Sequence, residues 1–251
     1  MICGFDTSLS VVAGAAIGYD ETLRTLKGPV FISKRWGRGY HYFDRLRESA
    51  RSHEWILDLQ ALMNISLGVE EVFITQEEPW PLGMVGGKMS SALKQQAEIS
   101  GAFLGGLVRY GFTNVAQMNS VRWRQMIADD LGITIHHSKW KDPALCAVYD
   151  CKPEDTGKFR SKQWAVELFG EIIPDWPDII ASKDGNVPKP ESSRAKPFQP
   201  DDRYDALAIM WTWAEELSKG PLQAEIQEAV KPRQTTKNDK LARVKKALQI
   251  S

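Results

Sequence analysis

The chain has few cysteines, no long apolar run and no net charge. Its three cysteines, Cys3, Cys146 and Cys151, form no CxxC pair, which argues against a disulfide framework and favours reduced thiols. The longest apolar runs, such as residues 101–108, are far shorter than the roughly 20 residues of a membrane span. The first residues also lack the pattern of a signal peptide. We therefore expect a soluble, cytoplasmic protein without a membrane partner.

Charge is balanced overall but unevenly distributed. The 251 residues carry 32 basic and 32 acidic side chains, so no overall positive field is available to hold a polyanion. Residues 231–251 nevertheless carry a net charge of +6, which leaves −6 for the rest. With 43% hydrophobic residues the chain can bury a substantial core. We expect a globular domain over residues 1–217 and a basic tail over residues 218–251.

Hydrophobic spacing predicts strands and helices in a mixed order. Apolar runs separated by short polar breaks indicate an antiparallel meander in the first thirty residues. Strands are predicted at residues 2–5, 11–19, 22–32, 71–76 and 112–118. Helices are predicted at residues 40–63, 90–110, 121–131, 158–169 and 206–213.

The longest predicted helix and two loops carry further expectations. Residues 40–63 read as one amphipathic helix, with Phe43 and Leu57 among its apolar positions. A glycine-rich loop is predicted at residues 81–87. Four prolines and little apolar content predict a mobile loop at residues 183–200.

Three separate segments each carry a carboxylate at the edge of an apolar element. Asp6 ends the first predicted strand and Glu77 ends the fourth, while Asp205 begins a helix that is apolar nearly all round. Asp202 lies three residues before Asp205, so the two acids share a helical face and repel unless a cation lies between them. Such oxygen ligands suit Mg²⁺ or Mn²⁺, which activate water and neutralise a leaving oxygen.

Residues 4–8 (GFDTS), 77–80 (EEPW) and 202–205 (DRYD) resemble, in order and in spacing, the three acidic motifs of RuvC-type Holliday junction resolvases. The resemblance covers residues 2–217 and is nearer to phage-encoded relatives. It implies an α/β fold with a ribonuclease H-like mixed five-stranded sheet flanked by helices. It also implies a homodimer that resolves four-way DNA junctions by paired symmetric nicks, as a crossover junction endodeoxyribonuclease.

The resemblance also implies roles for individual residues. Asp6, Glu77, Asp202 and Asp205 match the catalytic, metal-binding acids, which would hold two Mg²⁺ ions, with Mn²⁺ as a substitute. Glu78 leaves the second acid ambiguous by one position. Trp80 matches the family's aromatic residue soon after the second acid, and Lys158 lies near the start of its basic helix. With further basic residues taken from the sequence itself, the predicted DNA-binding side chains are Trp80, Arg122, Arg124, Lys158, Lys162, Lys240, Arg243, Lys245 and Lys246.

The predicted dimer involves the helix at residues 90–110. In the family the helix after the second acidic motif contributes to the dimer interface. In this chain Gly101 and Gly105 give that helix a stripe of small residues, along which another backbone can approach closely.

Several of these features also have ordinary structural explanations. Asp6 alone is more typical of a turn or a helix cap. Asp202 and Asp205 are equally typical of an acidic helix N-terminus, which the helix dipole favours. The basic tail is also compatible with a disordered, solubilising terminus. A zinc site at His136, His137, Cys146 and Cys151 is disfavoured, because the spacing fits none of the common patterns.

Other functions remain as alternatives. A broader branched-DNA (flap or fork) endonuclease, or a less selective one of the same fold, is the main alternative, because the acids specify the reaction and not the DNA geometry. An actin-like ATPase normally has glycine directly after its first acid, where this chain has Thr7 and Ser8. A non-catalytic DNA-binding protein would give no reason for three acids beside apolar segments.

Overall fold

The structure is a computed structural model that describes residues 1–9, 11–20, 25–36, 40–79, 84–85, 88–89, 91–133, 160–170 and 201–218. No helix within these ranges is both long enough and apolar enough to cross a membrane. The predicted loop at residues 183–200, the basic tail, and the histidines and cysteines considered for zinc between positions 136 and 151 all lie outside the described residues.

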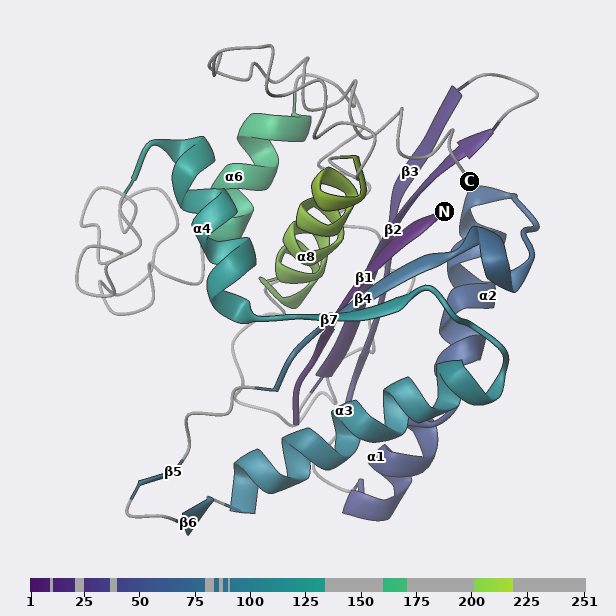
Figure 1. The fold of residues 1–251 in the computed structure, drawn as a ribbon, viewed down its shortest axis with the longest axis vertical. Coiled ribbons are helices and arrows are strands. Elements are labelled where there is room, and N and C mark those ends of the chain that lie inside the picture. The colour runs from purple at the N-terminus through teal and green to yellow at the C-terminus, as the bar shows by residue number, and fades with distance from the viewer. Residues whose placement is uncertain are drawn as a thin grey trace, which may run out of the picture.

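One mixed sheet of five strands forms the centre of the fold, in the order β3-β2-β1-β4-β7 (Figure 1). The meander consists of β1 (Ile2–Thr7), β2 (Val11–Asp20) and β3 (Thr25–Arg35), which pair antiparallel. β4 (Phe73–Glu77) runs parallel to β1, and β7 (Val115–Met118) runs parallel to β4. This is the ribonuclease H-like arrangement, and it confirms the predicted fold class.

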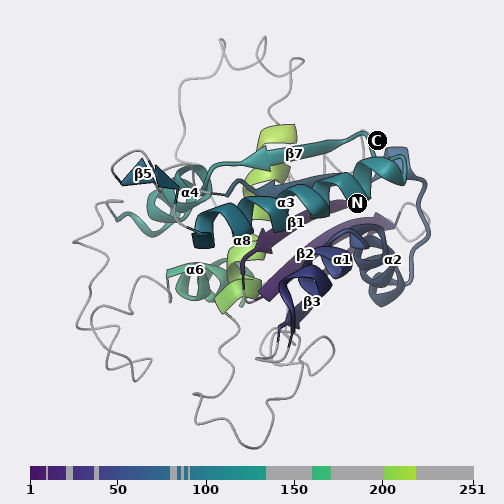
Figure 2. The same ribbon diagram turned by 90° about the horizontal axis from the view of Figure 1, so that it is seen from below.

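Helices cover both faces of this sheet (Figure 1). One face is covered by α1 (Tyr42–Ser49), α2 (Ser52–Met63) and α3 (Ser91–Arg109). The other face is covered by α4 (Ser120–Leu131), α6 (Arg160–Phe169) and α8 (Asp201–Ser218). Within the second group α8 lies directly against β1 and β2 (Figure 2). A short 3₁₀ turn, η1 (Val69–Glu71), precedes β4.

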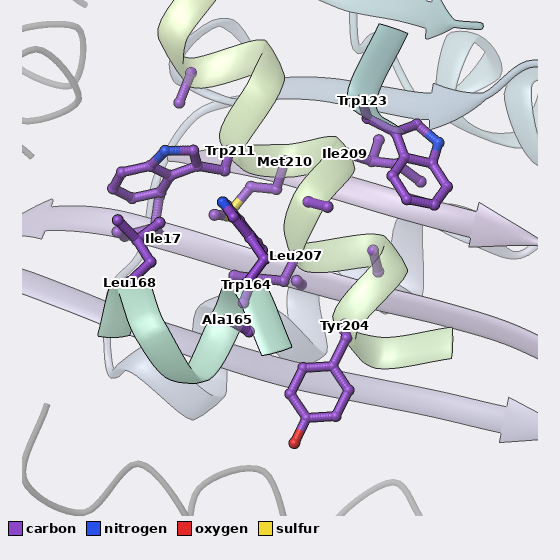
Figure 3. Close-up of a cluster of buried hydrophobic side chains, with 14 of the residues drawn as sticks. Ile17, Trp123, Trp164, Ala165, Leu168, Tyr204, Leu207, Ile209, Met210 and Trp211 are labelled. Atoms are coloured by element: carbon purple, nitrogen blue, oxygen red, sulfur yellow. The ribbon is translucent and has the colours of Figure 1, made fainter. Parts of the chain in front are cut away.

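Each face of the sheet has its own hydrophobic core. On one side Leu207, Ile209 and Met210 of α8 lie in a cluster that includes Trp123 of α4 and Trp164 of α6 (Figure 3). On the other side a second cluster joins the strands to α2 and α3. The prediction that the last helix is buried on more than one side is confirmed, because α8 lies between the sheet and two further helices.

The helix predicted at residues 40–63 is two helices, so that prediction was wrong. α1 ends at Ser49 and α2 begins at Ser52, where α3 crosses close by. The Ser52 hydroxyl donates to the Phe103 carbonyl of α3 at 2.5 Å. The expected apolar face was also wrong, because Phe43 is 76% exposed and Leu57 is 54% exposed.

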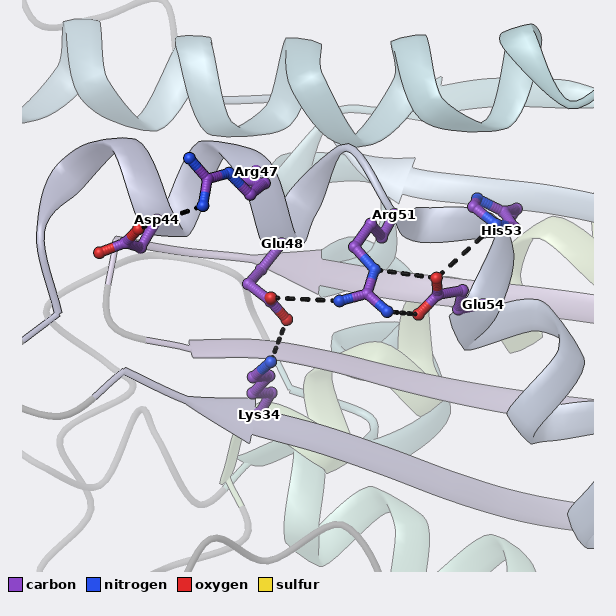
Figure 4. A network of polar contacts seen from close by, with 7 residues as sticks. All are labelled: Lys34, Asp44, Arg47, Glu48, Arg51, His53 and Glu54. Atoms are coloured by element: carbon purple, nitrogen blue, oxygen red, sulfur yellow. Dashed lines mark hydrogen bonds and ion pairs between the residues drawn. The ribbon is translucent and has the colours of Figure 1, made fainter.

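A polar network surrounds this break and ties it to the sheet (Figure 4). Lys34 of β3 pairs with Glu48 of α1, and Arg51 pairs with Glu48 at 3.4 Å and with Glu54 of α2 at 2.7 Å. Lys34 and Arg51 lower the pKa of Glu48, chiefly through the hydrogen bond from Lys34. The outer ends of these side chains reach solvent, so we expect each pair to contribute little to stability.

A further difference lies in the predicted glycine-rich loop. Two short antiparallel strands, β5 (Met84–Val85) and β6 (Lys88–Met89), occur there. They flank Gly86 and Gly87, a pair that is typical of two-residue hairpin connections.

Close contact between β1 and α8 depends on Gly4. A Cβ atom placed on Gly4 would lie 2.5 Å from the carbonyl oxygen of Ala206 and would also collide with the backbone of Met210. Any side chain at position 4 would therefore push α8 away from the strand. Because Asp6 and Asp205 belong to these two elements, Gly4 sets how closely their carboxylates approach.

We predict that Gly4→Ala lowers the free energy of unfolding by about 2 to 3 kcal/mol, since the added methyl group meets backbone that cannot move aside locally. Urea denaturation measures this loss. Gly101→Ala is the matched control, because a Cβ there meets nothing within 4 Å. It should raise stability by up to about 1 kcal/mol through helix propensity. Equal effects of both substitutions would contradict this account of Gly4.

Candidate active site

Alternation along β1 separates two sets of side chains. Ile2 packs in the core on the α8 side, and Gly4 contacts the α8 backbone, so Asp6 points to the same side. Cys3 and Phe5 pack in the opposite core, beside α3. The carboxylate at the end of this strand is therefore delivered to the face that α8 covers, where it is 7% exposed.

Glu77 lies beside Asp6 because of the parallel register of β1 and β4. The last paired residues of these strands are Phe5 and Gln76, and the two acids are the next residues along each strand. Asp6 and Glu77 hydrogen-bond through their side chains. Glu78 is exposed beyond the end of β4, so the structure brings Glu77 to the first acid and leaves its neighbour in solvent.

The first two turns of α8 add the remaining acids. Asp202 and Asp205 are half-buried, and their charges act on Asp6 from the facing helix. The structure thus brings together four carboxylates from three segments that are far apart in the sequence. Their assignment as catalytic, metal-binding residues stays a prediction.

Burial and mutual repulsion keep protons on this cluster. The pKa of Asp6 is raised well above its ordinary value, first by burial and then by the charges of Glu77, Asp205 and Asp202. Neutral Asp6 then donates a hydrogen bond to Glu77. Burial is also the main reason why the pKa of Asp205 rises to about 7. A cation between these groups would relieve the same repulsion.

Three side chains from α4 and α6 contact or stabilise the acids. The Trp123 indole donates to Glu77 at 3.4 Å, and the Arg124 guanidinium lies over the Trp123 ring at 4.9 Å. The charge of Arg124 lowers the pKa values of Glu77 and Asp205, which partly offsets the effect of burial. The Ser161 hydroxyl donates to Asp205 at 2.5 Å.

These supporting roles are not predicted by the sequence. The only signal for Ser161 is its place in the first turn of a predicted amphipathic helix, beside Lys162, where a hydroxyl is equally typical of a helix start. In the sequence Trp123 lies between Arg122 and Arg124, two predicted DNA-binding residues, and nothing there indicates a contact with Glu77. Its bond to Glu77 depends on how α4 crosses the end of β7, which spacing alone does not reveal.

The predicted DNA-binding residues have different surroundings. Arg124 is half-buried beside the acids, and Lys162 is half-buried in the first turn of α6. Arg122, by contrast, points to the far part of α8 and pairs with Glu216 at 2.5 Å. The other candidates, Trp80, Lys158, Lys240, Arg243, Lys245 and Lys246, lie outside the described residues.

The cluster fits a hard divalent cation by the chemistry of its donors. All four acids offer carboxylate oxygens, the ligands that Mg²⁺ and Mn²⁺ prefer. Among the residues that the structure describes, no group of three His, Cys, Asp or Glu side chains is arranged to hold a metal ion as it stands. Asp6 and Glu77 bond to each other, so ion binding would require these two carboxylates to exchange that bond for the ion.

Comparisons with known proteins give only a distant likeness. No protein-family model matches the chain, and no curated protein sequence matches it. Two structures of RuvC from Thermus thermophilus are similar to it, each at 12% sequence identity. One, in complex with a Holliday junction substrate, has a TM-score of 0.42 over 89% of this chain and 94% of that chain. The other has a TM-score of 0.43 over 90% and 97%.

We predict that Asp205→Asn stabilises the metal-free protein at pH 8 and has little effect at pH 4. The pKa of about 7 in the folded state lies above the ordinary value of 3.8. Protonated Asp205 therefore makes its full contribution to wild-type stability below about pH 4. The protein loses this contribution as pH rises through about 7. Asparagine keeps the side-chain volume and can still accept the bond from Ser161.

Thermal unfolding in EDTA between pH 4 and pH 8 measures this effect. The difference in Tm between variant and wild type should grow from pH 4 to about pH 7 and then level off. Asp58→Asn, on the exposed side of α2, is the control and should give only a small difference. A constant difference for Asp205→Asn would show that its carboxyl is not penalised in the folded protein.

Proposed function

We propose that the protein is a metal-dependent DNA endonuclease that resolves four-way junctions by paired symmetric nicks. The observation that carries the proposal is the meeting of Asp6, Glu77, Asp202 and Asp205 on one face of the sheet. Burying four acids together lowers stability unless they serve a ligand. The order and spacing of the three acidic motifs, which resemble those of RuvC-type resolvases, support the choice of DNA junctions as substrate.

In the proposed reaction the acids bind two divalent ions. Asp6, the most buried of the four, would hold the ions together with Glu77 and the two aspartates of α8. When bound, the ions supply the positive charge that activates the attacking water and stabilises the leaving oxygen. Trp123 holds Glu77 and Ser161 holds Asp205, so the carboxylates keep their directions while the phosphate binds.

Arg124 has a different role from Arg122 in this proposal. Arg124 lies beside the acids and is the described cation best placed to contact the phosphate that is cut, together with Lys162. Arg122 is paired with Glu216, so a DNA contact there would have to compete with an existing ion pair. Trp80 and the cations of the tail remain proposed contacts with bases and with the phosphates of a DNA arm.

The first functional prediction is that Asp6→Asn or Glu77→Gln abolishes cleavage in Mg²⁺ while junction binding persists. Each substitution removes an anionic ligand with little change in volume. Binding should even tighten, because less negative charge faces the phosphates. Single-turnover cleavage and a gel-shift assay on the same junction measure the two effects.

Glu78→Gln is the matched control, since it removes the same charge one residue away in solvent. Its cleavage rate should stay within about twofold of wild type, because an exposed charge beyond the strand contributes little to the acid cluster. A more damaging effect of Glu78→Gln than of Glu77→Gln would mean that the wrong acid is assigned at this strand end. Persistent cleavage by Asp6→Asn would rule out the proposed reaction.

The substrate is tested by comparing a four-way junction, a fork, a flap and a linear duplex at equal concentration in Mg²⁺. We expect paired nicks at symmetric positions in the junction and slower cutting of the other three. Equal rates on fork and flap would favour the broader branched-DNA endonuclease, because the same acids would then act without selecting junction geometry.

A two-fold dimer is also part of the proposal, since a junction has two equivalent strands to cut. The outer face of α3 is suited to the contact, because Gly101 and Gly105 are exposed and Val108 is 63% exposed. Light scattering at micromolar concentration should give about twice the mass of one chain. Gly105→Arg should shift the protein to a monomer, whereas Leu57→Arg, on exposed α2, should not. A monomeric wild type, with or without junction DNA, would contradict the dimer.

A further inference from the structure

A buried polar network lies behind the acids, on the opposite face of the sheet. The Gln76 side-chain amide donates to the Thr7 hydroxyl at 2.6 Å and to the Ser100 hydroxyl of α3 at 2.8 Å. All three side chains are buried, with the Phe5 and Phe103 rings packed together in the same core. Both N–H groups of the amide are therefore bonded, whereas the Gln76 side-chain oxygen is buried without a partner among the described residues.

The network occupies the point where pairing between β1 and β4 stops. Backbone pairing of these strands ends at Phe5 and Gln76, one residue before the acids. Asp6 and Thr7 remain paired to β2, whereas Glu77 remains paired to β7. The two acids thus lie beyond the last backbone pair between their strands, and when both are ionised their repulsion favours separation of the strand ends.

The hydrogen bond between Gln76 and Thr7 joins β1 and β4 at the point where their backbone pairing ends. Thr7 follows Asp6, and Gln76 precedes Glu77, so the bond joins the two strands within one residue of each acid. Because side chains alternate, the bond lies on the α3 face while the carboxylates point to α8. The bond from Gln76 to Ser100 fixes the amide rotamer from a third element.

We propose that Gln76, with Thr7 and Ser100, is a positioning residue that holds Asp6 and Glu77 at the separation needed to share one divalent ion. This inference rests on the proposed metal-dependent function. Loss of one bond of the network lets the strand ends part. Two carboxylates then have to be brought together again when an ion binds, which weakens ion binding.

The test uses the whole protein and two kinds of measurement. Thr7→Val and Ser100→Ala each remove one hydroxyl of the network with little change in shape. Ser52→Ala is the matched control, because its hydroxyl is equally buried and bonds the α3 backbone away from the acids. Thr7→Ser keeps the hydroxyl and serves as the rescue variant.

The first measurement is hydrogen exchange in metal-free protein, followed by mass spectrometry of peptides that cover residues 2–9 and 73–79. Thr7→Val and Ser100→Ala should exchange faster in both segments, whereas Ser52→Ala should not. Thr7→Ser should restore wild-type exchange. Unchanged exchange at both strand ends in the two network variants would overturn the positioning role.

The second measurement is Mn²⁺ binding by calorimetry without DNA. We expect the dissociation constant to rise about tenfold in Thr7→Val and Ser100→Ala, which matches the loss of about one buried hydrogen bond. Ser52→Ala should lower the Tm to a similar degree without changing Mn²⁺ affinity. Equal Mn²⁺ affinity in wild type, Thr7→Val and Ser100→Ala would also overturn the proposal.

The two measurements separate this inference from the proposed function. If wild-type protein bound no Mn²⁺, the metal-dependent function would fail, and with it the part of the inference that concerns ion binding. Hydrogen exchange in metal-free protein would still show whether the network holds the two strand ends together.

Discussion

The close approach of α8 to β1 is the constraint on which the site depends. A strand and a helix normally keep their side chains between their backbones, but Gly4 removes one of these side chains and lets the helix lie against the strand. This contact fixes the distance of α8 from the sheet and its rotation about its own axis. Its first two turns then project Asp202 and Asp205 toward the end of β1, where Asp6 emerges. A helix held farther away would leave these acids in solvent.

That approach has an energetic cost, because it concentrates negative charge in a poorly hydrated place. Burial raises the pKa of Asp6 and of Asp205, so the folded protein holds protons that the unfolded chain would release. The cost is offset by α8 itself, whose Leu207, Met210 and Trp211 are fully buried. The apolar character of this helix on nearly all sides is thus a condition for carrying its acids.

Much of this arrangement can be predicted from the sequence, because it follows from local patterns. Alternation in the first thirty residues predicts the meander, and apolar residues all round predict that α8 is buried. The acids stand out because each ends or begins an apolar element. Glu77 and Glu78 cannot be separated in this way, because both are acids at a strand end. The structure distinguishes them through the register of β4 against β1.

The parts that the sequence does not predict depend on contacts between distant elements. The break between α1 and α2 lies where α3 crosses, and no proline or glycine marks it in the sequence. The bond from Trp123 to Glu77 depends on how α4 leaves β7. Arg122 and Arg124 look equivalent in the sequence, yet one pairs with Glu216 and the other lies near the acids. Periodicity shows which face a side chain occupies, but not which residue it meets there.

The two faces of the sheet therefore contribute to the site in different ways. On the α8 face the charges of Glu77, Asp205 and Asp202 raise the pKa of Asp6, and a cation between these groups would relieve that repulsion. On the α3 face the neutral side chains of Thr7, Gln76 and Ser100 attract one another across the same two strands. Because side chains alternate between the two faces of a sheet, hydrogen bonds on the α3 face can oppose repulsion between carboxylates on the α8 face. Because Ser100 directly precedes the exposed Gly101 on α3, a partner bound to that helix would also be connected to the acids through these bonds.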